Sequence, residues 1–121
     1  KGDQSDTAFL YTIKEQFDVI VEDGSHRSDH QQQTFLHLFF NNLKRGGVYV
    51  VEDLKCCIDP HYWSNTVTRF EDTFLWALKN YKETGVLSNY YFTEHQNEIF
   101  APIIKSVELY EQEGIAFIFK S

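Results

Sequence analysis

The stretch that decides the fold is Phe17-Asp18-Val19-Ile20-Val21-Glu22-Asp23-Gly24-Ser25-His26, together with Val48-Tyr49-Val50-Val51-Glu52-Asp53. Each half reads as a short apolar strand that runs into acidic residues, and a helical pattern lies between them. A crossover helix predicts a parallel strand pair, so both acidic ends fall on one edge of a sheet. Ligands of open α/β sheets bind at that edge. The sequence therefore predicts one shared site for residues that are far apart in the chain: Asp23, His26, Glu52 and Asp53.

The composition bounds the classes of protein that this chain can represent. Its 121 residues are 42% hydrophobic and 17% aromatic, which suits the core of a single domain. A formal net charge of −7 argues against nucleic acid and anionic membranes as partners. No stretch is long and apolar enough to span a bilayer. The adjacent Cys56 and Cys57 lack disulfide and zinc spacing, so we expect two reduced thiols in a cytoplasmic protein.

Hydrophobic spacing predicts the remaining elements. A first helix should end near Gln16, a second fills the gap between the two strands, and a third runs from about Val67 to Asn80. The segment 81–102 predicts only a short helix and an irregular insertion. Ser106–Tyr110 and Ile115–Phe119 predict a closing hairpin across residues 111–114. The expected order is thus αβαβα followed by an antiparallel pair of strands.

The second helix carries the clearest end signals. Ser28 and Gln31 match a capping box, in which the two side chains satisfy free backbone N–H groups at a helix start. Lys44 and Arg45 fall in the expected last turn, where cations favour the helix dipole. Gly46 suits the left-handed position just past a helix end.

Four motifs carry a resemblance to a known family: Gly2-Asp3-Gln4-Ser5-Asp6, Glu22-Asp23-Gly24-Ser25-His26, Leu43-Lys44-Arg45-Gly46-Gly47-Val48-Tyr49-Val50-Val51-Glu52-Asp53 and Ser106-Val107-Glu108-Leu109-Tyr110. They resemble the class I S-adenosylmethionine-dependent methyltransferases, in particular the macrolide-sugar O-methyltransferases of the mycinamicin and demethylmacrocin type. The resemblance covers nearly the whole chain and is weakest over residues 81–102. It implies a Rossmann-like α/β sheet in which an antiparallel strand lies between two parallel ones.

The same resemblance implies that the first strands and the glycine-rich loop of the family lie upstream of this sequence. The chain begins with Lys1 and contains no Met, so we expect residues 1–121 to be the C-terminal part of a methyltransferase catalytic domain. On their own, these residues should bind the cofactor weakly or not at all. The sheet edge where the missing strands belong should invite self-pairing into a homo-oligomer.

The acidic residues are the candidate metal ligands. The resemblance implies that Asp23, Glu52 and Asp53 bind magnesium. Carboxylates crowded at one sheet edge repel each other unless a cation lies among them, and their hard oxygens suit Mg²⁺ or Ca²⁺ better than zinc. The alternative is that they are ordinary solvated loop acids or helix caps.

His26 is the candidate general base, also by resemblance. An unperturbed histidine has a pKa of about 6.5, so it can take a proton near neutral pH. His30 is the alternative base, whereas His37 and His95 read as surface residues. The resemblance also implies that Asp3, Gln4 and Ser5 bind the cofactor, because in the family this loop approaches its adenine end. The alternative is that they form the N-cap of the following helix.

Glu22 faces the cofactor or is only a strand-end acid. Tyr62 and Trp63 either stack on a sugar ring or pack over the core. Both alternatives stay open in each case.

The main hypothesis is Mg-assisted transfer of a methyl group from S-adenosylmethionine to a hydroxyl of a small molecule, such as a sugar in a glycosylated natural product. The first rival is a non-catalytic methyltransferase-like module with an assembly or regulatory role. A metal-dependent hydrolase is a weaker rival, because the sequence carries no nucleophile motif.

Overall fold

The computed structural model describes residues 10, 13–24, 27–64 and 67–121. Its sheet has four strands in the order β1-β2-β4-β3. The elements run along the chain as β1 (Phe17–Glu22), α2 (Ser28–Asn41), β2 (Leu43–Val51), η1 (Leu54–Ile58), η2 (Pro60–Tyr62), η3 (Phe70–Asp72), α3 (Phe74–Thr84), α4 (Glu94–Phe100), β3 (Ile104–Tyr110) and β4 (Ile115–Lys120). None of the helices in these residues is long and apolar enough to cross a membrane. The predicted first helix lies mostly outside the described residues, of which Leu10 is helical and buried.

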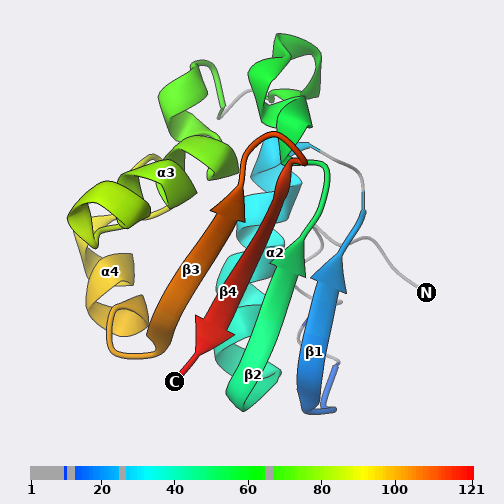
Figure 1. The fold of residues 1–121 in the computed structure, drawn as a ribbon, viewed down its shortest axis with the longest axis vertical. Coiled ribbons are helices and arrows are strands. Elements are labelled where there is room, and N and C mark those ends of the chain that lie inside the picture. The colour runs from blue at the N-terminus through cyan, green and yellow to red at the C-terminus, as the bar shows by residue number, and fades with distance from the viewer. Residues whose placement is uncertain (1–9, 11–12, 25–26, 65–66) are drawn as a thin grey trace.

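The strand pairing confirms the predicted topology. β1 and β2 are parallel, and β4 runs antiparallel to both β2 and β3. The last strand of the chain is therefore inserted between two strands that point the same way (Figure 1). The carboxyl ends of β1, β2 and β3 all lie at one end of the sheet, and the β3–β4 turn reaches that same end.

An aromatic core fills the space between the sheet and its helices. Phe35 of α2 lies at its centre, with ring centroids 5.2 Å from Tyr49 and from Phe74, and 5.6 Å from Phe100. Phe92, from the insertion before α4, closes the cluster with its ring 6.0 Å from that of Phe35. The high aromatic content of the chain is thus used to bury one face of the sheet.

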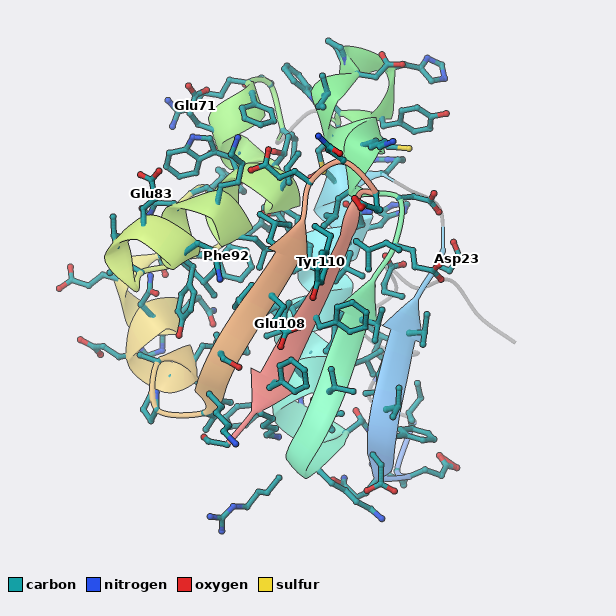
Figure 2. The ribbon with its side chains drawn as sticks, in the orientation of Figure 1. Asp23, Glu71, Glu83, Phe92, Glu108 and Tyr110 are labelled. Carbon is teal, nitrogen blue, oxygen red and sulfur yellow. The ribbon has the colours of Figure 1, made fainter. Side chains whose placement is uncertain are left out.

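The opposite face of the sheet stays open: no helix of the described residues covers it (Figure 1). Val19 and Val21 of the edge strand β1 are each 54% exposed. On the neighbouring strands the same face continues through half-buried Val50 and Phe117, which are register partners in the β2–β4 pair. Figure 2 shows Tyr110 of β3 on this side as well. Contiguous exposed apolar surface of this kind is typical of an interaction surface.

The predicted ends of the second helix are wrong. The helix begins at Ser28 with Arg27 as its N-cap, and no side chain caps it, so the capping box is not formed. It ends at Asn41, and residues 44–47 belong to β2. While β1 advances from Phe17 to Val19, β2 advances from Leu43 to Val48. The basic residues and glycines therefore form a bulge in a strand rather than a last helical turn.

Two further predictions are corrected. The third helix begins at Phe74 instead of near Val67, because the chain first forms the short η3 turn. His37 is buried at 9% exposure, so it is not a surface residue, whereas His95 is exposed as expected. The short helix predicted within 81–102 is confirmed as α4, and the closing hairpin is confirmed as β3–β4.

Candidate functional site

The two acidic turns lie side by side at the carboxyl edge of the sheet. Glu22 and Val51 are register partners in the parallel pair β1–β2, and the backbone N–H of Glu52 donates to the carbonyl of Glu22 at 3.2 Å. Asp23 and Glu52 are therefore the residues that leave adjacent strand ends. Figure 2 shows Asp23 at the end of β1, beyond the sheet. The prediction that both acidic turns share one edge is confirmed by this pairing.

Glu22 shapes the first acidic turn. Its side chain is only 5% exposed, and its carboxylate accepts a hydrogen bond from the backbone N–H of Gly24 at 2.9 Å. Burial raises the pKa of the neighbouring Tyr49 phenol well above its ordinary value, and the negative charge of Glu22 raises it further. These contacts fit a turn-forming, strand-end acid, and a cofactor role for Glu22 stays a prediction.

Asp53 adopts an unusual backbone conformation in the second acidic turn. Its φ of 58° and ψ of 33° lie in the left-handed region, which costs free energy for a residue with a Cβ. The next N–H, of Leu54, donates to the carbonyl of Gly114 at 2.8 Å. The N–H of Cys56 donates to the carbonyl of Asp53 at 3.1 Å. The tip of the β3–β4 hairpin thus holds this turn in place.

A buried polar cluster joins the start of α2 to η3, to the start of α3 and to the segment before α4. Ser28 is fully buried, and its Oγ accepts from the backbone N–H of Phe74 at 2.9 Å. Gln32, also fully buried, donates to the carbonyl of Asp72 at 2.9 Å and accepts from Asn89 at 2.7 Å. Sequence reasoning missed this cluster. The available signal was three polar residues, Ser28, Gln31 and Gln32, on the core side of an amphipathic helix.

Arg27 and Asp29 brace the loop that enters α2. The guanidinium of Arg27 donates to both carboxylate oxygens of Asp29, at 3.1 and 2.8 Å. Asp29 is buried at 7% exposure, so this two-point ion pair is shielded from solvent on one side. The pair fixes the backbone directly after the segment that carries His26 in the sequence.

Trp63 packs the loop that follows the second acidic turn. Its indole N–H donates to the carbonyl of Cys57 at 2.9 Å, so it anchors the loop on η1. The rings of His61 and Tyr62 meet edge to face at 5.2 Å, and His61 is exposed. Of the two roles left open for this pair of aromatics, the structure therefore favours packing for Trp63.

Several predicted site residues lie outside the described residues: Asp3, Gln4, Ser5 and His26. Among residues 10, 13–24, 27–64 and 67–121, no group of three or more His, Cys, Asp or Glu side chains is arranged to hold a metal ion. The backbone nevertheless brings the two acidic turns together at one edge of the sheet, and their carboxylate oxygens are the hard donors that Mg²⁺ prefers. The magnesium role of Asp23, Glu52 and Asp53 stays a prediction.

A hollow of about 330 Å³ borders the first acidic turn. Its walls come from β1, α2 and β2, and include Glu22, Asp23, Gly24, Thr34 and Tyr49. The volume lies at the lower end of small-molecule sites. Its position at the carboxyl end of a parallel strand is the one expected for a ligand of an open α/β sheet.

Comparison with known proteins identifies the class of fold and its relatives. No family model matches the chain. It is 39% identical over 74 residues to the 8-demethyl-8-(2-methoxy-alpha-L-rhamnosyl)-tetracenomycin-C 3'-O-methyltransferase of Streptomyces olivaceus, a match that covers 59% of this chain and 19% of that protein. It is also 40% identical over 57 residues to the mycinamicin VI 2''-O-methyltransferase of Micromonospora griseorubida, covering 45% of this chain and 14% of the relative.

Solved structures give the same answer over the full length of the chain. The MycE methyltransferase of the mycinamycin biosynthetic pathway, in complex with Mg, SAH and mycinamycin VI, superposes with a TM-score of 0.74 at 27% identity. A crystal form of MycE with Mg and SAH gives a TM-score of 0.76 at 26% identity. Each match covers 100% of this chain and 31% of the other. The resemblance to macrolide-sugar O-methyltransferases and the Rossmann-like fold class are both confirmed, and the chain spans less than a third of these relatives.

Proposed function

We propose that residues 1–121 are the C-terminal part of the catalytic domain of an S-adenosylmethionine-dependent, Mg-assisted O-methyltransferase. One observation carries the proposal: the whole chain superposes on MycE, whose structures contain Mg and SAH. The acceptor is a hydroxyl of a small molecule, and we infer a sugar of a glycosylated natural product because the curated relatives are named for such substrates. The adjacent thiols, both free of disulfides, support a reducing compartment such as the cytoplasm.

In this proposal the acidic edge holds the metal. Asp23, Glu52 and Asp53 supply carboxylate oxygens, which are the donors that Mg²⁺ prefers. When bound there, the ion lowers the pKa of the acceptor hydroxyl and orients it. The parallel pairing of β1 with β2 supports this assignment, because it fixes the spacing between the first acidic turn and the second.

His26 removes the proton from the acceptor hydroxyl in this proposal. A histidine with a near-neutral pKa suits that role at physiological pH. The segment before α2 carries it, and the contacts of Arg27 with Asp29 and of Ser28 with Phe74 brace the start of that helix. Asp3, Gln4, Ser5 and Glu22 are proposed to contact the cofactor.

Calorimetric titration of S-adenosylhomocysteine, with and without Mg²⁺, tests the proposal. We expect the intact protein to bind it and residues 1–121 alone to bind weakly or not at all, because the glycine-rich loop of the family is not part of this sequence. Absence of binding by the intact protein would overturn the proposal and favour the non-catalytic module.

The base assignment needs a separate experiment in the intact protein. We expect His26→Ala to lower turnover at saturating Mg²⁺ by about 100-fold or more, the usual contribution of a general base. His95→Ala is the matched control, since His95 is an exposed residue of α4, and its turnover should not change. Equal turnover of His26→Ala and the wild type would remove His26 from the mechanism.

A further inference from the structure

Gln31 is a fully buried glutamine in the first turn of α2. Its side-chain amide donates to the backbone carbonyl of Glu52 at 3.5 Å. On its other side, the thiol of Cys57 donates to the amide oxygen of Gln31 at 3.6 Å. One side chain therefore connects α2 to the second acidic turn and to η1. Both bonds are long. The bond to Cys57 is buried and the bond to Glu52 is partly buried, and the side chain of Gln31 itself is fully buried, where a polar group without a partner is costly.

The turn that Gln31 touches needs support from its surroundings. Asp53 has a φ of 58°, and left-handed conformations of such residues persist only where neighbouring groups hold them. Two backbone bonds do so: Glu52 N–H to the carbonyl of Glu22 at 3.2 Å, and Leu54 N–H to the carbonyl of Gly114 at 2.8 Å. These bonds come from β1 and from the hairpin tip. Gln31 adds a contact from the helix side, which neither of them provides.

The chemistry of the amide suits this position. A glutamine is both a donor and an acceptor, so it can serve the Glu52 carbonyl and the Cys57 thiol at once. Burial raises the pKa of the Cys57 thiol, which keeps the proton that Cys57 donates. Neither an apolar residue nor a charged one could satisfy both partners.

We propose that Gln31 is a positioning residue for the metal site: its amide fixes the Glu52–Asp53 turn against α2 without touching the ion. The inference rests on the proposed function, in which Glu52 and Asp53 bind Mg²⁺. A turn held from three sides presents its carboxylates already oriented, so less conformational freedom is lost when the ion binds. Residues that orient metal ligands typically change metal affinity by about 10- to 100-fold when replaced.

The test compares two neighbouring glutamines in the intact protein. Gln31→Met keeps the volume of the side chain and removes both hydrogen bonds. Gln32→Met is the matched control, because Gln32 is equally buried in the same turn but its amide contacts Ser28, Asp72 and Asn89. The Kd for Mg²⁺ is measured by calorimetry with S-adenosylhomocysteine present. We expect it to rise about tenfold in Gln31→Met, since the contact is to a carbonyl at long distance, and to stay unchanged in Gln32→Met.

Steady-state kinetics gives a second readout. In Gln31→Met the Mg²⁺ concentration for half-maximal rate should rise in step with the Kd, while kcat at saturating Mg²⁺ stays near the wild-type value. A purely structural role would lower the fraction of active protein, and therefore kcat, without changing the Mg²⁺ dependence.

The outcomes separate the inference from the proposed function. If the wild type binds Mg²⁺ and Gln31→Met binds it equally well, or if both variants weaken binding alike, the positioning role is overturned and the function stands. If the wild type does not bind Mg²⁺, the proposed function fails first and the inference with it. Should Gln31→Met not fold, Cys57→Ala removes the thiol that donates to Gln31, together with its 3.8 Å contact to the Ser28 hydroxyl. About a twofold weaker Mg²⁺ affinity is then expected, and an unchanged affinity would overturn the inference.

Discussion

Replacing Lys120 by Met should lower the free energy of unfolding by about 3 kcal/mol. Lys120 lies near the end of β4 and is only 8% exposed. Its ammonium group donates to three backbone carbonyls: Phe39 at 2.8 Å, Phe40 at 3.2 Å and Leu43 at 2.7 Å. Two of these belong to the last turn of α2, where carbonyls have no partner within the helix. The side chain therefore joins the last strand of the sheet to the end of its central helix.

The magnitude follows from these contacts. Methionine keeps most of the buried hydrocarbon of the lysine side chain, so the loss comes from the hydrogen bonds and from the cation, whose Nζ also lies 5.7 Å from the centre of the Phe39 ring. Each buried carbonyl that loses its donor costs about 1 kcal/mol or more. Losing the cation at the helix C-terminus adds about 0.5 kcal/mol to the predicted loss. The longest of the three hydrogen bonds contributes less than the other two, which lowers the predicted loss by a similar amount.

Urea unfolding of the intact protein at 25 °C measures the change, provided that the m value stays constant. Lys105→Met is the control, because Lys105 is an exposed residue of β3 and its replacement should change the free energy by less than about 0.5 kcal/mol. A loss in Lys120→Met no larger than that of the control would refute the reasoning. It would mean that water replaces the ammonium group without cost.

Three further predictions concern the acidic edge. Gly114→Ala should lower the free energy of unfolding by about 2 kcal/mol in urea, because Gly114 has a φ of 70° and an added Cβ would lie 2.9 Å from Lys55 Cγ. Gly46→Ala is the control: its φ of 82° is similar but the space around it is open, so it should cost only about 1 kcal/mol. Equal losses would mean that the contact with Lys55 does not matter. Tyr49→Phe should raise the free energy of unfolding at pH 8 by about 1 kcal/mol, since the buried hydroxyl has no partner among the described groups. Because burial raises the folded pKa of Tyr49 above 10.0, the wild type should lose further stability relative to the variant above pH 10.0, and parallel pH profiles would contradict this. Asp53→Asn should keep stability within about 0.5 kcal/mol, as Asn tolerates left-handed backbone, while Mg²⁺ affinity falls at least tenfold by calorimetry; unchanged affinity would remove Asp53 from the metal site.

The topology could be predicted because local patterns and chain connectivity agree. Apolar runs at residues 17–21 and 48–51, with a helix between them, allow only a parallel pair. The turn signal at residues 111–114 fixed the closing hairpin in the same way. Both predictions rest on contacts that are short in sequence or forced by the handedness of crossovers.

The ends of the second helix could not be predicted, because tertiary contacts decide them. Ser28 has the right chemistry for a cap, but its hydroxyl is taken by the N–H of Phe74, 46 residues away. The basic residues after Asn41 look like a helix C-terminus, but pairing with β1 draws them into a strand with a bulge. In each case a distant partner outweighs a local preference of about 1 kcal/mol.

The sequence predicted which sheet edge carries the acidic residues, but not the residues that hold this edge in place. The acidic residues stood out because each follows an apolar strand. Gln31 did not, because a polar residue on a helix reads as surface unless the third dimension is known. The left-handed turn at Asp53 was equally invisible, since nothing in its local sequence calls for a positive φ.

The tip of the β3–β4 hairpin has a practical consequence for protein engineering. Polar turn tips such as residues 111–113 are the usual positions for affinity tags and inserted loops. Here the next residue, Gly114, is buried and bonded to the backbone beside Asp53. An insertion at this tip would therefore disturb the acidic edge, although it lies more than fifty residues away in sequence. The same coupling makes the tip a good place for a fluorescent reporter, whose signal should change when the edge rearranges.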